Sequence, residues 1–198
     1  MFTSVSITVA SEKPVLNRRK VNSIAISGSA CSGKTTLSTL LAKQLRWNHV
    51  NVGQLFRDLA GEQGLPIEKF GSLDDSALRK VDEGVKQRMK TASHVVWEGR
   101  LTAWLATTLP DVVSVYCVAG DRTRVKRCAG REHILLADAR RQIKQRDDEE
   151  GRVFSRLYGI ADIRREVHFD ILLDTARKVP VELLTEIMAV LNRDFVLE

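Results

Sequence analysis

Short apolar runs alternate with longer amphipathic segments along most of the chain. Runs rich in β-branched residues predict five strands, at 21–27, 49–52, 94–97, 112–118 and 169–173. The segments between them carry apolar residues three and four positions apart, as at Leu37, Leu40 and Leu41, which is helical spacing. This alternation predicts an α/β fold in which helices cover both faces of a parallel sheet. Ligands of such sheets bind at the carboxyl ends of the strands.

Three segments do not fit this simple alternation. Residues 53–91 leave room for several helices between the second and third strands, and residues 138–165 are crowded with charge. We expect both to be insertions above the sheet. A single helix over 138–157 would set Arg146 and Glu150 in the middle of its apolar face, so we predict a break at 147–151. Residues 1–20 are expected to form an extension, with a short strand at 4–9.

Composition limits the class of protein. The chain has 198 residues, enough for one sizeable domain, and its apolar run at 112–119 is too short to span a bilayer. Three cysteines form no CxxC pair and four histidines show no metal-ligand spacing, which favours a reduced cytoplasmic location. The net charge of +6 fits either nucleic acid or several phosphate groups, so the positions of the basic residues are decisive.

The segment from Gly28 to Thr35 matches the phosphate-binding pattern G-x-x-x-x-G-K-[ST], between a predicted strand and a predicted helix. Its backbone N–H groups and the helix N-terminus would surround phosphate oxygens. We expect Lys34 to bridge the β- and γ-phosphates of a nucleotide and Thr35 to contact Mg²⁺. The expected donor-binding residues are Gly28, Ser29, Ala30, Cys31, Ser32, Gly33, Lys34, Thr35 and Thr36. For Cys31 two roles are open: filling the turn, or redox chemistry.

Two arginines follow the second and third strands. Arg57 lies one turn into the helix that starts near Gly53, and Arg100 follows Glu98 and Gly99. Both are expected at the carboxyl edge of the sheet, facing the phosphate loop, where paired guanidinium groups could bind a second phosphate. For Arg57 the alternative is a surface ion pair. The chain shows no N-K-x-D motif, which argues against a switch GTPase.

At these residues the chain resembles the nucleoside monophosphate kinases, most closely the short-lid, archaeal-like cytidylate kinases. The segments that carry the resemblance run in family order from about 24 to 191 and include ISGSACSGKTTL, VNVGQLFRDLA, VVWEGRLTAWLA, DRTRVKRCAGRE and RDDEEGRVFSRLYGI. The resemblance implies a P-loop NTPase fold over 21–198, with a five-stranded parallel sheet. It also implies an acceptor-binding insertion at 53–91, a mobile short lid at 138–160, ATP as donor and CMP or dCMP as acceptor.

The resemblance also implies roles for individual residues. Arg57 and Arg100, beside Gly53 and Gly99, would hold the acceptor phosphate, and Glu98 would stand near the Mg²⁺. Arg127 would lie against the adenine, which would also touch the loop after Asp174 and Thr175. The transferring group would be surrounded by Lys34, Arg131, Arg146 and Arg152, although a solvated charged hairpin is the alternative for the lid.

The base of the acceptor could be recognised by other residues. Ser72, Asp74, Asp75 and Asp82 could read a cytosine amino group, and Trp97 and Trp104 could stack on a base or pack in the core.

Other functions remain open at this point. The same architecture could serve an adenylate-kinase-like enzyme, a kinase of a small metabolite such as shikimate, or an enzyme acting on a modified cytidine nucleotide. The basic cluster at 17–20 raises the alternative of a nucleotide-regulated RNA-binding protein. We expect small nucleotides as ligands, no nucleic-acid partner, no membrane association, and a monomer or weak dimer.

Overall fold

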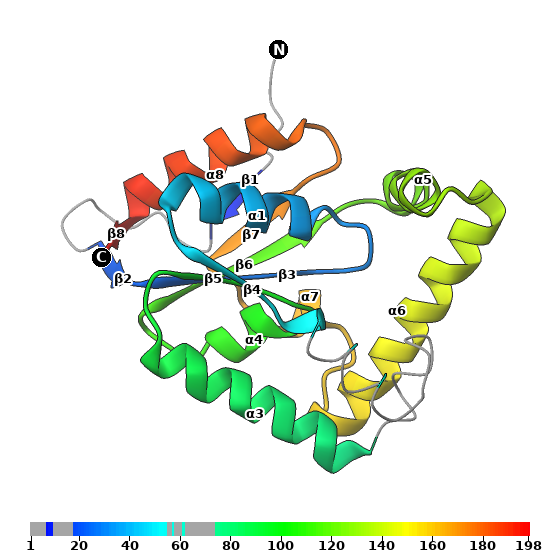
Figure 1. Ribbon diagram of the computed structural model, residues 1–198, viewed down its shortest axis with the longest axis horizontal. Helices are drawn as coiled ribbons and strands as arrows, with labels where there is room; N and C mark the ends of the chain where they lie inside the picture. Colours follow the sequence, from blue (N-terminus) through cyan, green and yellow to red (C-terminus); the bar gives the residue numbers. More distant parts are fainter. Residues whose placement is uncertain (1–6, 10–17, 55–56, 58–60, 62–73) are drawn as a thin grey trace.

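The computed structural model describes residues 7–9, 18–54, 57, 61 and 74–198. A six-stranded sheet forms its centre, and its hydrogen-bonded order is β1-β7-β6-β3-β5-β4 (Figure 1). These strands are β1 (Ile7–Val9), β7 (Ile171–Asp174), β6 (Val112–Val118), β3 (Ser23–Gly28), β5 (Val95–Glu98) and β4 (Asn48–Asn51). Neighbouring strands are parallel except β1, which runs antiparallel to β7.

The five strands predicted from the sequence are confirmed, each within two residues of its expected position. Residues 7–9 of the expected N-terminal strand form β1 and add a sixth strand, while residues 4–6 lie outside the described part of the chain. A second, two-stranded sheet pairs β2 (Arg19–Val21) with β8 (Phe195–Leu197). Segments near the two ends of the chain therefore complete both sheets.

Helices cover both faces of the central sheet, as expected. On one face, α1 (Lys34–Leu45) and α8 (Pro180–Asp194) bury Leu41 and Ile187 against strand residues such as Ile26 and Val115. On the other face, α3 (Asp75–Thr91) and α4 (Thr102–Ala106) enclose a cluster around Trp97. Figure 1 shows these two helical layers on opposite sides of the strands. Because both faces are covered, the central strands are almost continuously apolar.

Three further helices lie toward the carboxyl ends of the strands. They are α5 (Asp121–Glu132), α6 (Leu136–Tyr158) and α7 (Ile163–Glu166). The long α6 runs from the tip of α5 to the start of α3, where Val153 and Leu157 pack against Leu78 (Figure 1). Within the described residues, no helix combines the length and apolar character needed to cross a bilayer.

The predicted break at 147–151 is wrong, because α6 is helical without interruption from Leu136 to Tyr158. An unbroken helix is tolerated because the two charged side chains on its inner face are accommodated. Glu150 forms an ion pair with Arg100 at 2.5 Å, and Arg146 lines a cavity. A paired carboxylate does not carry the penalty of an isolated buried charge.

Candidate active site

The loop between β3 and α1 has the backbone shape of an anion-binding turn. Gly28 and Gly33 have φ angles of +156° and +90°, which residues with a side chain rarely adopt. A Cβ on Gly28 would lie 2.6 Å from the Cys117 carbonyl oxygen of β6. The glycine therefore allows β3 and β6 to stay paired while the chain turns into α1, whose N-terminus favours negative charge.

Two residues far along the chain hold this loop in place. The carbonyl oxygen of Ser32 accepts hydrogen bonds from the Thr175 hydroxyl at 2.5 Å and from the Arg127 guanidinium at 3.3 Å. Arg127 also donates to the Thr175 carbonyl at 2.5 Å. We call these three residues the loop clasp. It places Thr175 and Arg127 directly beside the phosphate loop, where the sequence predicted donor contacts.

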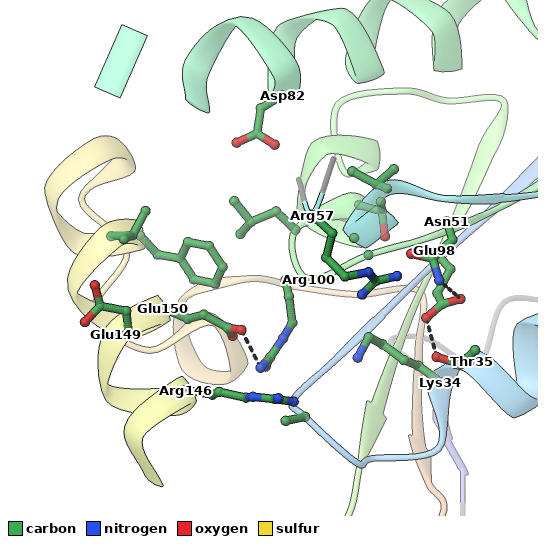
Figure 2. Close-up of a pocket in the computed structure, with 18 of the residues that line it drawn as sticks. Lys34, Thr35, Asn51, Arg57, Asp82, Glu98, Arg100, Arg146, Glu149 and Glu150 are labelled. Atoms are coloured by element: carbon green, nitrogen blue, oxygen red, sulfur yellow. Dashed lines mark hydrogen bonds and ion pairs between the residues drawn. The ribbon is translucent and has the colours of Figure 1, made fainter. Parts of the chain in front are cut away.

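Lys34 begins α1 and its ammonium group projects into the site (Figure 2). Removal of this group from solvent lowers its pKa to about 8, and the nearby positive charge of Arg100 acts in the same direction. A negative ligand would stabilise the charged form of this lysine, because phosphate oxygens would replace the solvation that water normally supplies.

Thr35 and Glu98 form a pair of oxygen donors beside Lys34. The Thr35 hydroxyl donates to Glu98 Oε1 at 2.5 Å, and the Glu98 side chain is buried. The other carboxylate oxygen contacts His49 Nε2 at 3.0 Å and accepts from Asn51 Nδ2 at 3.2 Å. A hydroxyl and a fixed carboxylate suit Mg²⁺, which prefers oxygen ligands and completes its shell with phosphates and water. These residues therefore fit the ion that the phosphate loop implies.

His49 and Asn51 are site residues that the sequence did not reveal. Both come from β4, whose Asn51 lies directly opposite Glu98 of β5 in the sheet register. Their signal in the sequence is weak, because it requires knowing that these two strands are neighbours. With that register known, a polar residue ending β4 would be expected beside the carboxylate.

Four of the six predicted arginines converge on one cavity of about 470 Å³. Arg57, Arg100, Arg131 and Arg146 line it together with Lys34 and Thr35, and Figure 2 shows Arg57, Arg100 and Arg146 pointing toward the hollow beside Lys34. Gly53 and Gly99 line the same cavity. The expectation that Arg57 and Arg100 share a hollow with Lys34 is therefore met.

Three of these arginines already have partners within the chain, and that of Arg131 is the neighbouring Glu132 at 2.8 Å. Arg57 donates to the Gln54 side chain at 2.7 and 2.9 Å, and Arg100 pairs with Glu150 of α6. Burial raises the pKa of Glu150, while the Arg100 charge acts against that rise. The sequence did not identify Glu150 as a site residue. Its carboxylate binds the Arg100 guanidinium, and a phosphate group could form the same type of charged hydrogen bond with Arg100.

Asp82 of α3 and Tyr158 of α6 line the end of the cavity beside α3. The Tyr158 hydroxyl donates to Asp82 at 2.6 Å, and burial raises the pKa of Asp82 to about 6. The Tyr158 ring lies 4.8 Å from that of Trp104. Trp97, in contrast, is buried in the core cluster between the sheet and α3.

Several other predicted residues do not reach the cavity. Arg152 is exposed and pairs with Glu149 at 2.5 Å, and it is absent from the described lining of the cavity. The Asp174 side chain accepts from the Ala176 N–H at 2.8 Å. Asp74 caps α3, Asp75 pairs with Arg156, and Ser72 lies outside the described residues. Thr36, in the first turn of α1, is exposed.

The sequence matches known proteins over most of its length. The model of the cytidylate kinase-like family matches residues 23–177. A cytidylate kinase from Pyrobaculum aerophilum is 37% identical over 156 residues, covering 77% of this chain and 83% of the relative. One from Sulfolobus acidocaldarius is 34% identical, covering 86% and 94%.

Solved structures with a similar fold include a gluconokinase from Sinorhizobium meliloti, with a TM-score of 0.61, 17% identity and coverage of 89% and 94%. A shikimate kinase from Acinetobacter baumannii has a TM-score of 0.57, 15% identity and coverage of 88% and 94%. At these identities the likeness concerns the fold alone, which is that of P-loop kinases. The family match and the archaeal relatives are more specific: this chain belongs to the cytidylate kinase-like family.

Proposed function

We infer that the protein transfers the γ-phosphoryl group of ATP to a nucleoside monophosphate, with CMP and dCMP as the preferred acceptors. The observation that carries this proposal is the cavity shared by the phosphate loop residues Lys34 and Thr35 and by Arg57 and Arg100. A kinase of this kind needs two phosphate sites within one enclosed space, since the reaction depends on positioning and charge neutralisation. The archaeal relatives named cytidylate kinase support the choice of acceptor.

The donor site would be built on the phosphate loop. Backbone N–H groups of residues 28–36 bind the phosphates, and Lys34 neutralises the β- and γ-phosphate oxygens. Arg127 and Thr175 keep the loop in shape, and the adenine would lie beside them. Mg²⁺, held by Thr35 and the carboxylate of Glu98, would neutralise charge on the donor oxygens. His49 and Asn51 fix the orientation of that carboxylate.

The acceptor phosphate would bind between Arg57 and Arg100. In doing so it replaces the Glu150 carboxylate as the partner of Arg100, because both are anions that accept paired guanidinium hydrogen bonds. The base would then lie toward α3, where ionised Asp82 can accept a hydrogen bond from the cytosine amino group. Tyr158 holds that carboxylate in place.

Transfer itself would require little covalent chemistry from the protein. Lys34, Arg131 and Arg146 approach the cavity from three different elements and would balance the charge of the moving group. Arg152 would join them only if α6 moves, since its side chain is exposed and pairs with Glu149 in this structure. Closure of α6 over both substrates would exclude water and limit hydrolysis of ATP.

The test is a coupled assay of ADP formation from ATP and Mg²⁺ with a panel of acceptors: CMP, dCMP, UMP, AMP, GMP and shikimate. We expect CMP and dCMP to have the highest kcat/KM, at least about tenfold above AMP, from base recognition at Asp82. A preference for AMP would support an adenylate-kinase-like enzyme instead. Turnover that no acceptor stimulates would contradict the proposal.

We also propose that the protein works in the cytoplasm as a monomer or weak dimer. The three cysteines are free thiols, which fits a reducing compartment. The described charged residues that line the cavity belong to one chain, which supports a site formed within a monomer. Sedimentation of the active enzyme at assay concentration would test the oligomeric state.

A further inference from the structure

The phosphate loop is attached to α5 by a row of side-chain contacts. Arg124 Nε donates to the Ala30 carbonyl at 2.8 Å, and Arg127 donates to the Ser32 carbonyl at 3.3 Å. Between these two anchors, Cys31 meets Cys128, which lies on the same face of α5. Both thiols are buried in the same side-chain cluster. The two cysteines are therefore neighbours, although they lie far apart in the sequence.

The two thiols differ in their access to solvent. Cys31 has a φ angle of +58°, a left-handed conformation that is unusual for a residue with a side chain, and it lines the nucleotide cavity. Cys128 is completely buried behind it, among Val125, Ala139 and Ile143. A small molecule entering the cavity would therefore reach Cys31 before Cys128.

The electrostatic surroundings favour the same order of reaction. Cys31 lies just before the N-terminus of α1, and Arg131 lines the same cavity. Burial, and then the neighbouring Cys31, raise the pKa of Cys128. Cys128 therefore stays protonated until its neighbour has reacted.

We propose that Cys31 and Cys128 form an oxidisable thiol pair that switches off nucleotide binding. A hydroperoxide of small size oxidises the Cys31 thiol to a sulfenic acid and is itself reduced to the alcohol or water. The Cys128 sulfur then attacks the sulfenic sulfur, forming the disulfide and releasing water. In total, two thiols lose two hydrogens and one hydroperoxide is reduced, and a dithiol reductant reverses the change.

The disulfide would distort the donor site. Bond formation brings the two sulfurs closer than non-bonded contact allows, so the loop moves toward α5 and the contacts at Ala30 and Ser32 change. Backbone N–H groups of the loop would then no longer aim at the phosphates, and misplacement on the order of 1 Å can cost roughly a hundredfold in rate. This inhibition rests on the proposed donor site, whereas formation of the disulfide does not.

The experiment treats the reduced full-length protein with hydrogen peroxide or cumene hydroperoxide, with and without ATP and Mg²⁺. We expect a mass loss of two hydrogens and a tryptic peptide pair joined through Cys31 and Cys128. CMP-dependent turnover should fall by at least about tenfold and return after dithiothreitol. Bound ATP covers Cys31 and should slow the reaction.

Two variants distinguish the pair from general oxidation. Cys128→Ala should have wild-type turnover before oxidation but cannot form the disulfide. Cys128→Ser is the second variant if the alanine variant is destabilised. In this variant a sulfenic acid should be trapped on Cys31 by dimedone. Cys117→Ala removes the third cysteine, which is buried in β6, and should still form the disulfide.

Three results would overturn the proposal: no linked peptide, a peptide linked through Cys117, or unchanged turnover in protein that carries the link between Cys31 and Cys128. The mass measurement does not depend on catalysis. A linked peptide in a protein that never phosphorylates CMP would refute the kinase proposal and leave the thiol pair standing. Binding of a fluorescent ATP analogue to the oxidised and reduced forms would then measure the effect on the loop.

Discussion

Lys34 shows how a single side chain can be prepared for a negative ligand. Its pKa of about 8 in the substrate-free protein reflects lost solvation, with Arg100 adding to the effect. A bound triphosphate reverses this balance. The folded protein carries the desolvation penalty of the Lys34 ammonium group. Part of the binding energy of the donor therefore comes from compensating this penalty with phosphate charge.

Replacing this lysine tests its role in the transfer step. Lys34→Met should lower kcat by roughly a hundred- to a thousandfold, because charge on the moving phosphoryl group loses its compensation. The KM for CMP should change little. Lys43→Met, an exposed lysine near the end of the same helix, is the matched control for steady-state kinetics. Equal effects of the two variants would contradict the assignment.

Arg57 is expected to act on acceptor binding more than on chemistry. Arg57→Met should raise the KM for CMP by about tenfold or more, from loss of charged hydrogen bonds worth roughly 1.5–3 kcal/mol, with a smaller change in kcat. Arg88→Met, which removes an exposed arginine near the end of α3, serves as its control. A fall in kcat at unchanged KM would place Arg57 in the transfer step instead.

Asp82 gives the protein a distinct dependence on pH. Because the folded-state pKa is raised to about 6, the folded protein favours the protonated acid, and that stabilisation is lost as pH rises through about 6. Asp82→Asn should therefore be more stable than the wild type at pH 8, by roughly 1–3 kcal/mol, with little difference below pH 4. Urea unfolding at both pH values measures this.

Catalytic activity should rise with pH over the range in which the stabilising effect of protonated Asp82 is lost. If ionised Asp82 accepts the cytosine amino group, kcat/KM for CMP falls as pH drops through about 6, while kcat/KM for ATP is less affected. A flat profile for CMP across this range would argue that Asp82 supports the fold without reading the base.

At the scale of elements, the sequence predicted features that depend on neighbouring residues, but not features that depend on contacts between residues far apart in the chain. The strands, the phosphate loop and α1 could be recognised because their signals lie within a dozen neighbouring residues. The continuity of α6 could not, since it depends on Arg100 meeting Glu150 across the cavity. The Tyr158 to Asp82 bond joins positions 76 residues apart, and spacing alone carries no information about such contacts.

The end of α6 offers a test of helix stability. Gly159 caps the helix with a φ angle of +71° and donates its N–H to the last turn. Gly159→Ala should destabilise the protein by roughly 1–2 kcal/mol, since a Cβ is disfavoured in the left-handed region. Gly130→Ala, at an exposed helical position in α5, should stabilise it by about 0.5–1 kcal/mol. Opposite signs in thermal unfolding are the expected outcome.

At the scale of the whole molecule, Asp170 connects the two sheets. Its carboxylate accepts from Arg19 of β2 at 2.7 Å and from the Ser114 N–H and hydroxyl of β6 at 2.8 and 2.9 Å. Asp170 precedes β7 and so stands at the opposite end of the strands from the phosphate loop. The arrangement separates a structural junction from the site of chemistry.

Asp170→Ala should therefore lower the free energy of unfolding by roughly 2–4 kcal/mol, because it leaves the buried Ser114 N–H and the Arg19 charge without their partner. The KM values for ATP and CMP should stay within about twofold of wild type, since the site is built by other residues. Lys20→Ala, which breaks an exposed surface pair with Glu198, should change stability little. Altered KM values at normal stability would contradict this separation.

The loop clasp also bears on how the molecule is made. Ser32 appears early in translation, but its partner Thr175 stands 143 positions later, so the ribosome must expose β7 before the cradle for phosphates can close. Nascent chains shorter than this lack a finished pocket. Binding of ATP can therefore stabilise the chain only after β7 has docked. While synthesis continues, the earlier strands are stabilised by their own apolar contacts.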